Sequence, residues 1–429
     1  MNEEQSVLAD RIRGLYRPRI IDPIISEKLS ALGGVMITGP KSCGKSWTGF
    51  THSKSAIFLG EEEVNRFASL NPQAALEGEH PHLVDEWQDV PKLLDIARRN
   101  IDFNSKKGMY IFTGSTTPPL KKTFHTGIGR FSSIQMRTMS LFESGDSNGS
   151  VSLSEVFENG RINVAHSNLD YQKAVGLVCR GGWPGALGVD ETAAIGISYD
   201  YFSSLTSMDT SRVDGKKRSS TTMELILRSL ARNNATTASI PTIVADIQGA
   251  GGKISEGTVR SYMDVLKRLF VIEEQNAWHP HIRSRTRIRT SSVRHFCDPS
   301  LAAAILGARP IVLQKDTKTM GSLFETLCYR DLSVYASGIG GRVFHYRDDS
   351  DLEVDEIIQL EDGRWGAVEV KLGTFEFEKA AANLIRMKNK MVEAGAEKPS
   401  FLMIVSATGN VAHTRPDGVI EAPIDCLRP

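Results

Sequence analysis

The stretch that decides the fold is VMITGPKSCGKS, residues 35–46. Its last eight residues match G-x-x-x-x-G-K-[ST], the pattern of a phosphate-binding loop. The apolar run VMIT precedes the loop and a helical pattern follows it, which is the strand–loop–helix context that the pattern requires. We therefore interpret this loop as a nucleotide site rather than as an ordinary glycine turn.

The residue types of the loop suit a triphosphate. Glycines allow the backbone to wrap around a phosphate without Cβ clashes, so that successive N–H groups point at the anion. Lys45 is expected to reach the β- and γ-phosphates, and the Ser46 hydroxyl to ligate Mg²⁺. The predicted nucleotide-binding residues are Gly39, Pro40, Lys41, Ser42, Cys43, Gly44, Lys45 and Ser46. The predicted cofactors are ATP and Mg²⁺.

A second motif lies downstream, where the short apolar run His82-Leu83-Val84 ends in Asp85 and Glu86. In P-loop ATPases the first acid holds Mg²⁺ through water and the second polarises the attacking water. An Asp-Glu pair alone could equally begin a helix. The upstream loop favours the catalytic interpretation, with Asp85 as a metal residue and Glu86 as a catalytic residue.

A third strand pattern, residues 109–112, ends at Thr113-Gly114-Ser115. Thr113 and Ser115 are both candidates to contact the γ-phosphate or the attacking water. Arg130 follows and could neutralise transition-state charge in a neighbouring subunit, as an arginine finger does. The alternative is that Arg130 is a surface residue or a partner of Glu143.

The amino-acid composition excludes several classes of protein. The 51 Lys and Arg residues equal the 51 Asp and Glu residues, which excludes a globally basic nucleic-acid coat and an acidic solvating protein. Five scattered cysteines without a CxxC pair indicate neither a disulfide framework nor a zinc ribbon. The first residues carry acids and lack the apolar stretch that a signal peptide needs, and no run approaches the ~20 apolar residues of a membrane span. We expect a cytoplasmic protein with no membrane partner.

The chain changes character along its length, and 429 residues suggest about three domains rather than one. Strands alternate with helical patterns over residues 20–130, which predicts a parallel, helix-covered sheet in an α/β core over residues 1–145. Residues 146–215 are mainly helical. Three helical patterns and a basic segment over residues 216–297 resemble a winged helix-turn-helix. Residues 298–429 read as a mixed α/β domain.

The last domain contains a second charged constellation. Asp355 lies in LEVDEIIQL, and Glu369 and Lys371 lie in WGAVEVKL, with a turn between the two strand patterns. Residues 369 and 371 share one face of a strand. If Asp355 pairs opposite, two carboxylates could bind one Mg²⁺ and Lys371 could orient water. The alternative is the ordinary alternation of charges along an exposed strand.

A basic segment precedes that domain. Between His279 and His295 the sequence contains Arg283, Arg285, Arg287 and Arg289 and no acid. Arginines at every second position would line one face of a strand and suit the phosphates of DNA or RNA. A solvated hairpin wing, or a strand that pairs with acids of another domain, is an equal alternative.

These motifs together resemble the AAA-type ATPases of bacteria and archaea that carry a C-terminal domain of unknown function. The matching stretches are YRPRIID, VMITGPKSCGKS, LVDEWQDVPKLLD, YIFTGST, GGWPGAL, RLFVIEE, HFCDPSLAAAIL, GSLFETLCYRDL, LEVDEIIQL and AVEVK. The resemblance implies an ATPase core with a helical lid over residues 146–215, a winged-helix segment, and a restriction-endonuclease-like last domain related to PD-(D/E)xK nucleases. It also implies that Glu325 joins Asp355 and Glu369 as a metal residue. The chain departs from the pattern at Lys41, Trp87 and the polar residues 144–154.

The sequence supports two functions. The first is an ATP-hydrolysing AAA-like protein whose nucleotide state controls a C-terminal, nuclease-like domain that handles nucleic acid. The alternative is a non-catalytic switch gated by ATP, in which the last domain only binds nucleic acid or a protein partner. No motif determines the substrate or the oligomeric state, and a finger role for Arg130 presupposes a homo-oligomer.

Overall fold

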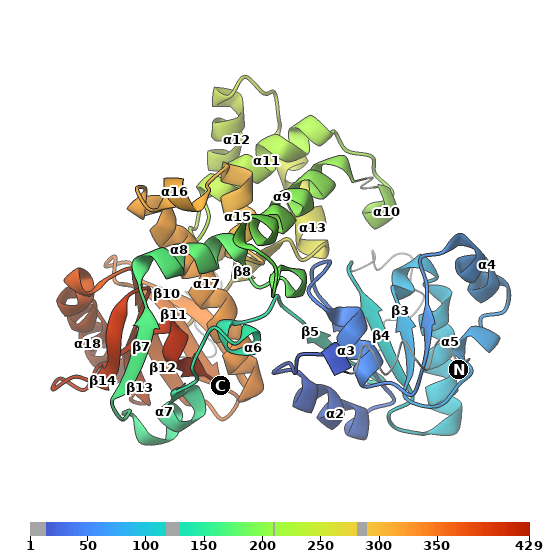
Figure 1. Cartoon of the computed structure of the whole chain (residues 1–429), viewed down its shortest axis with the longest axis horizontal. Helices are drawn as coiled ribbons and strands as arrows, with labels where there is room; N and C mark the ends of the chain where they lie inside the picture. Colours follow the sequence, from blue (N-terminus) through green and yellow to red (C-terminus); the bar gives the residue numbers. More distant parts are fainter. Residues whose placement is uncertain (1–13, 117–128, 209–210, 281–289) are drawn as a thin grey trace. The chain divides into compact units, whose positions relative to one another are not determined.

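The computed structural model describes residues 14–116, 129–208, 211–280 and 290–429. The chain divides into two compact units, whose elements are labelled in Figure 1. Unit 1 consists of Met1–Thr138, Asp209–Arg218 and Met263–Val271. Unit 2 consists of Met139–Met208, Ser219–Tyr262 and Ile272–Pro429.

Unit 1 is built on a five-stranded parallel sheet in the order β2-β3-β4-β1-β5. The strands are β1 (Gly34–Thr38), β2 (Ser55–Phe58), β3 (His82–Asp85), β4 (Tyr110–Gly114) and β5 (Phe131–Gln135). The parallel sheet predicted from the alternating strand and helix patterns is confirmed. Because parallel strands end at one edge, the residues that follow β1, β3 and β4 lie together at that edge.

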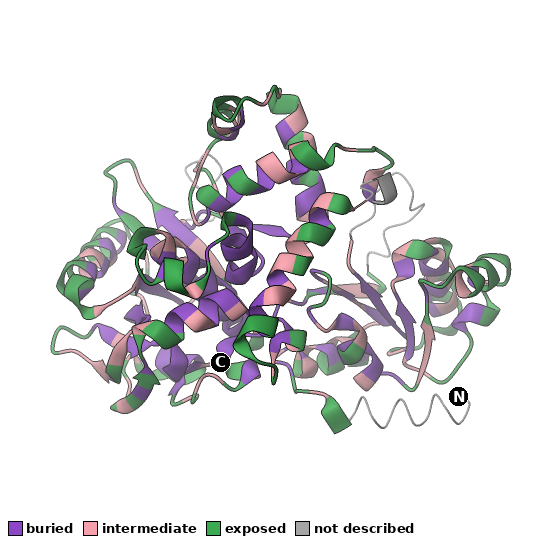
Figure 2. Cartoon of the chain, turned by 45° about the horizontal axis from the view of Figure 1, so that its top comes forward, coloured by how far each residue is buried: buried purple, intermediate pink, exposed green. Residues whose placement is uncertain are grey.

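Helices cover both faces of this sheet. They are α2 (Asp22–Ala31), α3 (Lys45–Thr51), α4 (Glu62–Leu70) and α5 (Lys92–Asn104). Leu83 and Ile111 join the core cluster formed with α2 and α3, whereas Val84 and Phe112 join the cluster formed with α4 and α5. Successive strand residues thus face opposite sides and both sides are buried (Figure 2), which explains why the strand sequences are almost continuously apolar.

Unit 2 contains a seven-stranded mixed sheet in the order β10-β11-β12-β13-β15-β14-β7. Its strands are β7 (Ala165–Leu169), β10 (Gly341–Arg347), β11 (Glu353–Leu360), β12 (Trp365–Lys371), β13 (Phe401–Ser406), β14 (Gly409–Thr414) and β15 (Ile420–Pro423). Strands β10, β11 and β12 pair antiparallel, and β12, β13 and β15 pair parallel. The mixed character predicted for residues 298–429 is confirmed.

Two smaller ribbons and a set of helices complete unit 2. The ribbons pair β6 (Val151–Ser152) with β16 (Leu427–Arg428), and β8 (Ile272–Gln275) with β9 (Val293–Phe296). The longer helices are α8 (Tyr171–Arg180), α9 (Glu191–Ser207), α11 (Ser220–Arg232), α12 (Ile240–Gly249), α15 (Pro299–Leu306), α17 (Thr317–Gly338) and α18 (Phe377–Glu393). Helix α13 (Glu256–Arg268) is divided between the two units. Helix α17 contacts β10 to β12, and α18 contacts β11 to β13.

Residues 146–215, expected to form a helical lid, contain α8 and α9 but also the strand β7. Strand β7 pairs antiparallel with β14 and forms one edge of the seven-stranded sheet. Its sequence, AHSNL, is short and polar, and only alternate residues are buried because one face of the strand is exposed. A strand of this kind carries too little apolar pattern to be recognised from sequence.

The described residues contain no helix that is both long and apolar enough to cross a membrane. All five cysteines are buried and unpaired.

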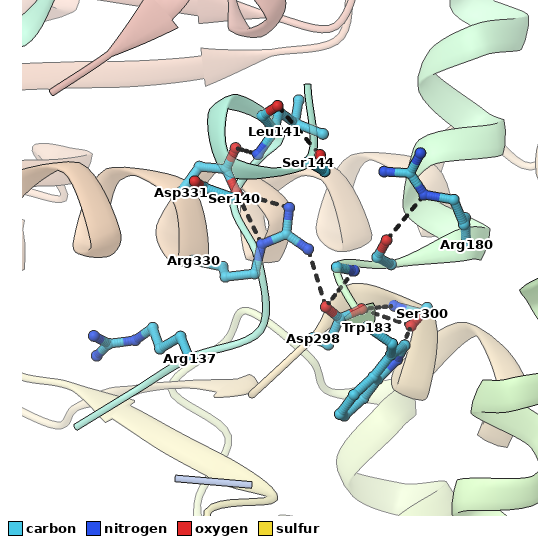
Figure 3. Close-up of polar contacts among 12 residues, drawn as sticks. Arg137, Ser140, Leu141, Ser144, Arg180, Trp183, Asp298, Ser300, Arg330 and Asp331 are labelled. Carbon is cyan, nitrogen blue, oxygen red and sulfur yellow. Dashed lines mark hydrogen bonds and ion pairs between the residues drawn. The ribbon is translucent and has the colours of Figure 1, made fainter. Parts of the chain in front are cut away.

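A buried arginine joins three segments of unit 2 (Figure 3). The Arg330 guanidinium donates to Asp298 Oδ2 at 2.9 Å and to Asp331 Oδ1 at 2.8 Å. Asp331 also accepts the backbone N–H of Leu141 at 2.8 Å, and Asp298 accepts that of Gly182 at 2.9 Å. These side chains are 2 % exposed or less. Their ion pairs therefore tie α17 to the segments around residues 141, 182 and 298.

We expect Arg330→Leu to lower the free energy of unfolding by about 3–5 kcal/mol, because two buried carboxylates lose their partner. Urea unfolding of the full chain measures this change. The matched control is Arg260→Met, which breaks an exposed pair with Glu256 and should cost about 1 kcal/mol or less. Equal effects of the two changes would contradict the assignment.

A buried histidine lies in a second polar network of unit 2. His295 Nδ1 is 2.9 Å from Thr326 Oγ1, and its Nε2 is 3.2 Å from Gln275 Oε1. The ring stacks on Tyr329 with the centroids 4.3 Å apart. Burial lowers the pKa of His295 to about 3, and the nearby His345 acts in the same direction. His295 is therefore neutral in the folded chain at neutral pH.

The depressed pKa predicts a pH-dependent loss of stability. The unfolded chain takes up a proton at His295 near pH 6.5 and the folded chain does not, so the histidine destabilises the fold as the pH falls below that value. Relative to His295→Gln, the wild-type free energy of unfolding should fall by about 1.4 kcal/mol per pH unit between pH 6 and pH 4. Urea titrations of both chains at several pH values measure the difference. Parallel pH profiles would disprove the prediction.

Candidate functional site

The phosphate-loop motif leaves β1 and enters α3, as the sequence predicted. Gly39 has φ +156°, and a Cβ added there would lie 2.0 Å from the Met136 carbonyl oxygen. Gly44 is the N-cap of α3 with φ +105°. Only glycine meets these two demands without strain. The loop thus has the close backbone approach and the helix start that a phosphate site needs.

The two predicted metal residues of this site lie together. The Ser46 hydroxyl lies close enough to the Asp85 carboxylate, at the end of β3, to lower the pKa of that acid. Thr113, the partner of Asp85 in the β3–β4 register, donates its hydroxyl to Asp85 Oδ1. Burial raises the pKa of Asp85, although the Thr113 and Ser46 hydroxyls oppose the shift. One hydroxyl and one carboxylate are oxygen ligands of the kind that Mg²⁺ prefers.

Lys45 lies beside the same residues and is 4 % exposed. Its ammonium donates to the Pro40 carbonyl oxygen across the loop at 2.7 Å. The positive charge of Lys45 lowers the pKa of Asp85, against the larger and opposite effect of burial. Among the other loop residues, Lys41 and Ser42 are exposed and Cys43 is buried.

Glu86, the predicted catalytic residue, has an uncommon backbone conformation. Its φ is +53°, a region that non-glycine residues rarely adopt and that costs about 1–3 kcal/mol. Its Oε2 accepts a hydrogen bond from Ser115 Oγ at 3.0 Å and another from Gln88 Nε2. Such strain persists where the surroundings hold the residue, and it concentrates at functional sites.

The structure thus divides the two hydroxyl candidates between the two acids. Thr113 bonds Asp85, and Ser115 bonds Glu86. Gln88 was not identified from the sequence, although it lies in the stretch LVDEWQDV. Its position two residues after Glu86 was the available signal. The 3₁₀ turn η2 (Trp87–Asp89) brings its amide back to the Glu86 carboxylate.

Arg130 lies in the turn directly before β5 and forms an ion pair with Asp102 at 2.7 Å, with its side chain 45 % exposed. Glu143, its suggested alternative partner, accepts the backbone N–H of Ser140 at 2.8 Å in a capping box. The structure therefore pairs Arg130 with a residue of α5. The finger role concerns a second subunit and stays a prediction.

The basic segment falls outside the described residues. Arg283, Arg285, Arg287 and Arg289 all lie between 281 and 289. Strand β8 precedes this segment and strand β9 follows it, and the two strands pair antiparallel.

The charged residues of the C-terminal domain form a second candidate site. The β11–β12 pairing ends at Glu356 and Val368, so Asp355 and Glu369 are the next residues on the two strands. The Lys371 ammonium donates to Glu369 Oε2 at 2.8 Å, to Asp355 Oδ2 at 3.4 Å and to the Val370 carbonyl oxygen at 2.9 Å. Asn383 of α18 donates to Glu369 Oε1 at 2.6 Å. The two carboxylates of Asp355 and Glu369 thus share the Lys371 ammonium as a partner. Asn383 was not identified from the sequence.

Burial and mutual repulsion shift the ionisation of these acids. Burial and the nearby Asp355 raise the pKa of Glu369 to about 8, and the same causes raise the pKa of Glu325 in α17 to about 8. The attraction of Asp355 and Glu369 raises the pKa of Lys371 although burial opposes it. Glu325 therefore lies close enough to interact with Asp355, Glu369 and Lys371.

A pocket of about 480 Å³ opens at this cluster. Its charged lining comprises acids and bases: Asp351, Glu353, Asp355, Glu369, Glu376, Lys371, Lys379 and Arg386. The oxygen donors suit a hard divalent cation and the bases suit a phosphate. Within the described ranges, however, no three His, Cys, Asp or Glu side chains already have a metal-binding arrangement. In this conformation the Lys371 ammonium takes the place of a cation partner for both carboxylates.

Comparison with protein families divides the chain into three matched segments. Residues 33–144 match the model of an AAA domain, residues 172–311 a domain of unknown function (DUF8612), and residues 320–427 a domain of unknown function (DUF4143). The first match covers the phosphate loop, Asp85 and Glu86. Residues 33–144 are therefore similar to an AAA domain that contains a phosphate loop. A search of curated proteins gives no match.

Comparison with solved structures gives weak similarities. The Walker-type ATPase PabY2304 of Pyrococcus abyssi is 14 % identical, over 66 % of this chain and 94 % of that chain, with a TM-score of 0.41. The ORC1 protein of Aeropyrum pernix in complex with DNA is 12 % identical, over 70 % of this chain and 96 % of that chain, with a TM-score of 0.21. These TM-scores are too low to support an argument.

Proposed function

We propose that this chain binds MgATP on residues 39–46 and hydrolyses it with Glu86 as the water-activating base. The observation that carries the proposal is the contact between Ser46 and Asp85 at the sheet edge, next to a glutamate held at positive φ. An isolated glycine turn would not bring these three groups together. The match of residues 33–144 to an AAA domain supports the same activity.

The residues at this site would have separate roles in ATP binding and hydrolysis. The loop N–H groups and Lys45 would hold the phosphates, and Ser46 and Asp85 would hold Mg²⁺, which supplies positive charge to the phosphate oxygens. Glu86 would accept the proton of the attacking water. Gln88 and Ser115 would aim the Glu86 carboxylate, since both donate to its Oε2.

We expect Lys45→Ala to weaken ATP binding strongly, and Glu86→Gln to keep ATP binding while lowering turnover by about 100-fold or more. A fluorescent ATP analogue measures affinity, and phosphate release measures turnover. The conservative change at residue 86 replaces the carboxylate with an amide, whose oxygen can still accept the hydrogen bond from the Ser115 hydroxyl.

These two variants also separate the enzyme from the alternative. In a non-catalytic switch gated by ATP, Glu86→Gln would change little because no water is activated. A Lys45→Ala chain with wild-type affinity and turnover would disprove the nucleotide site itself.

For the C-terminal domain, residues 298–429, we propose a nuclease-like site that handles nucleic acid. Asp355, Glu369 and Glu325 would hold Mg²⁺, which supplies a Lewis acid for a phosphate, and Lys371 would orient water. The shared contacts of Lys371 with Asp355 and Glu369 support this assignment. Lys379 and Arg386, two basic residues that line the pocket, would provide positive charge for a phosphate backbone.

The remaining segments complete the proposal. Residues 146–215 would act as a lid, and residues 216–297 as a winged helix whose Arg283, Arg285, Arg287 and Arg289 contact DNA or RNA. ATP turnover in residues 1–145 would control the last domain, and a homo-oligomer would let Arg130 act on a neighbouring site. The mixed-charge pocket equally supports the alternative in which the last domain binds nucleic acid or a protein without cutting it.

The C-terminal proposal predicts divalent-metal binding that depends on Asp355. With Lys45→Ala in the background to remove the ATP site, we expect Mn²⁺ binding by the full chain to weaken by about tenfold or more in Asp355→Asn, because one anionic oxygen ligand is lost. Calorimetry measures the binding. Asp362→Asn, in the exposed β11–β12 turn, is the control and should leave it unchanged.

Cleavage is measured separately with labelled DNA and RNA. Loss of cutting in Asp355→Asn would support the nuclease. Metal binding without cutting in the wild type would favour the binding-only alternative, and equal Mn²⁺ affinity in all variants would contradict the site.

A further inference from the structure

We propose that Arg19 is a positioning residue of the nucleotide site, which fixes the phosphate loop to the chain segment that leaves β5. The inference rests on the proposed ATP binding and adds a residue to it. Arg19 belongs to YRPRIID, residues 16–22, a stretch to which neither the motif analysis nor the family comparison assigns a role.

The Arg19 guanidinium bridges two backbone carbonyls from distant parts of unit 1. It donates to the Cys43 carbonyl oxygen, inside the phosphate loop, at 3.0 Å. It also donates to the Arg137 carbonyl oxygen, just after β5, at 2.9 Å. Arg19 is 6 % exposed. A planar guanidinium can make both bonds at once in a fixed geometry, which a lysine ammonium on its flexible stem does less well.

The loop depends on support at this place because its backbone is strained. Ser42, the residue before Cys43, has φ +65° without being glycine. A non-glycine residue stays in that region only when its surroundings hold it there. The bond from Arg19 to the next carbonyl holds the chain directly after the strained residue. It therefore stabilises the turn that directs the loop N–H groups inward.

The segment after β5 forms the other side of this support. Met136 donates its N–H to the Thr38 carbonyl oxygen at 2.7 Å, and its own carbonyl oxygen accepts the Cys43 thiol at 3.6 Å. Gly39 also lies directly against Met136. The outer side of the loop thus rests on residues 136 and 137, and Arg19 links the loop to that backing.

The stretch 16–22 has other anchors that do not use the guanidinium. The Tyr16 hydroxyl donates to Asp22 Oδ1 at 2.7 Å and lies 3.0 Å from Thr48 Oγ1 on α3. Asp22 Oδ1 also lies 3.0 Å from His52 Nε2 at the end of α3, and Asp22 Oδ2 accepts the Arg19 N–H at 2.7 Å. A change of the Arg19 side chain should therefore leave this stretch in place and release the loop.

The test uses the full-length chain with Arg19→Gln and Arg19→Lys, and with Arg66→Gln, an exposed arginine of α4, as the control. We measure the dissociation constant of a fluorescent ATP analogue with Mg²⁺, KM and kcat for ATP hydrolysis, and the melting temperature. Arg19→Gln should raise the dissociation constant and KM by about tenfold or more while kcat changes much less. Arg19→Lys should lie between wild type and Arg19→Gln, and Arg66→Gln should match the wild type.

A second change tests the strain directly. Ser42→Gly removes the cost of positive φ at residue 42. Added to Arg19→Gln, it should restore part of the lost ATP affinity, and the two effects should be non-additive. Additive effects of the two changes would overturn the link between Arg19 and the strained turn.

The outcomes separate this inference from the function on which it rests. Wild-type ATP binding with an unchanged dissociation constant and KM in Arg19→Gln would overturn the role of Arg19 alone. A lower melting temperature and a smaller active fraction at constant KM would reduce Arg19 to a structural residue and also overturn it. A wild-type chain that binds ATP no better than Lys45→Ala would overturn both proposals.

Discussion

A phosphate-binding loop must turn its backbone N–H groups toward the anion. The surrounding segments of unit 1 hold the loop in the conformation that this requires. The turn requires positive φ at Ser42 and Gly44 and a close backbone approach at Gly39. These conformations are costly for an isolated chain, so neighbouring segments must hold them. The parallel sheet supplies the frame because its strands end at one edge, where Asp85 meets Ser46. The site is thus a property of the sheet edge rather than of the loop alone.

Both candidate sites satisfy their buried charges internally. Asp85 accepts the Thr113 hydroxyl and lies near the Ser46 hydroxyl, and Glu369 accepts hydrogen bonds from Lys371 and Asn383. A buried carboxylate without a partner would be destabilising, so each site needs such donors before any ligand arrives. The donors differ in kind. Neutral hydroxyls at Asp85 leave its negative charge for a cation, whereas the Lys371 ammonium already neutralises its neighbours, and a metal would have to compete with it.

Elements with a strong local sequence pattern were predicted correctly, and elements without one were missed. The parallel sheet was predictable because its strands are continuous apolar runs and a helix pattern separates them. Strand β7 was not, because its polar sequence is stabilised by pairing with β14, far along the chain. Gln88 and Asn383 were missed for a related reason. Glutamine and asparagine form no motif by themselves, and their roles arise from the turn or helix that carries each amide to a carboxylate.

The sequence by itself determined the phosphate loop, the acids after β3 and the charged triad of the last domain, because each depends on residue types at fixed local spacing. Only the tertiary structure decided their partners. It paired Arg130 with Asp102, divided Thr113 and Ser115 between two acids, and joined Arg19 to the loop and to Arg137. Such contacts link residues that are far apart in the chain. Which residues meet depends on the packing of the whole sheet and its helices, which no local pattern records.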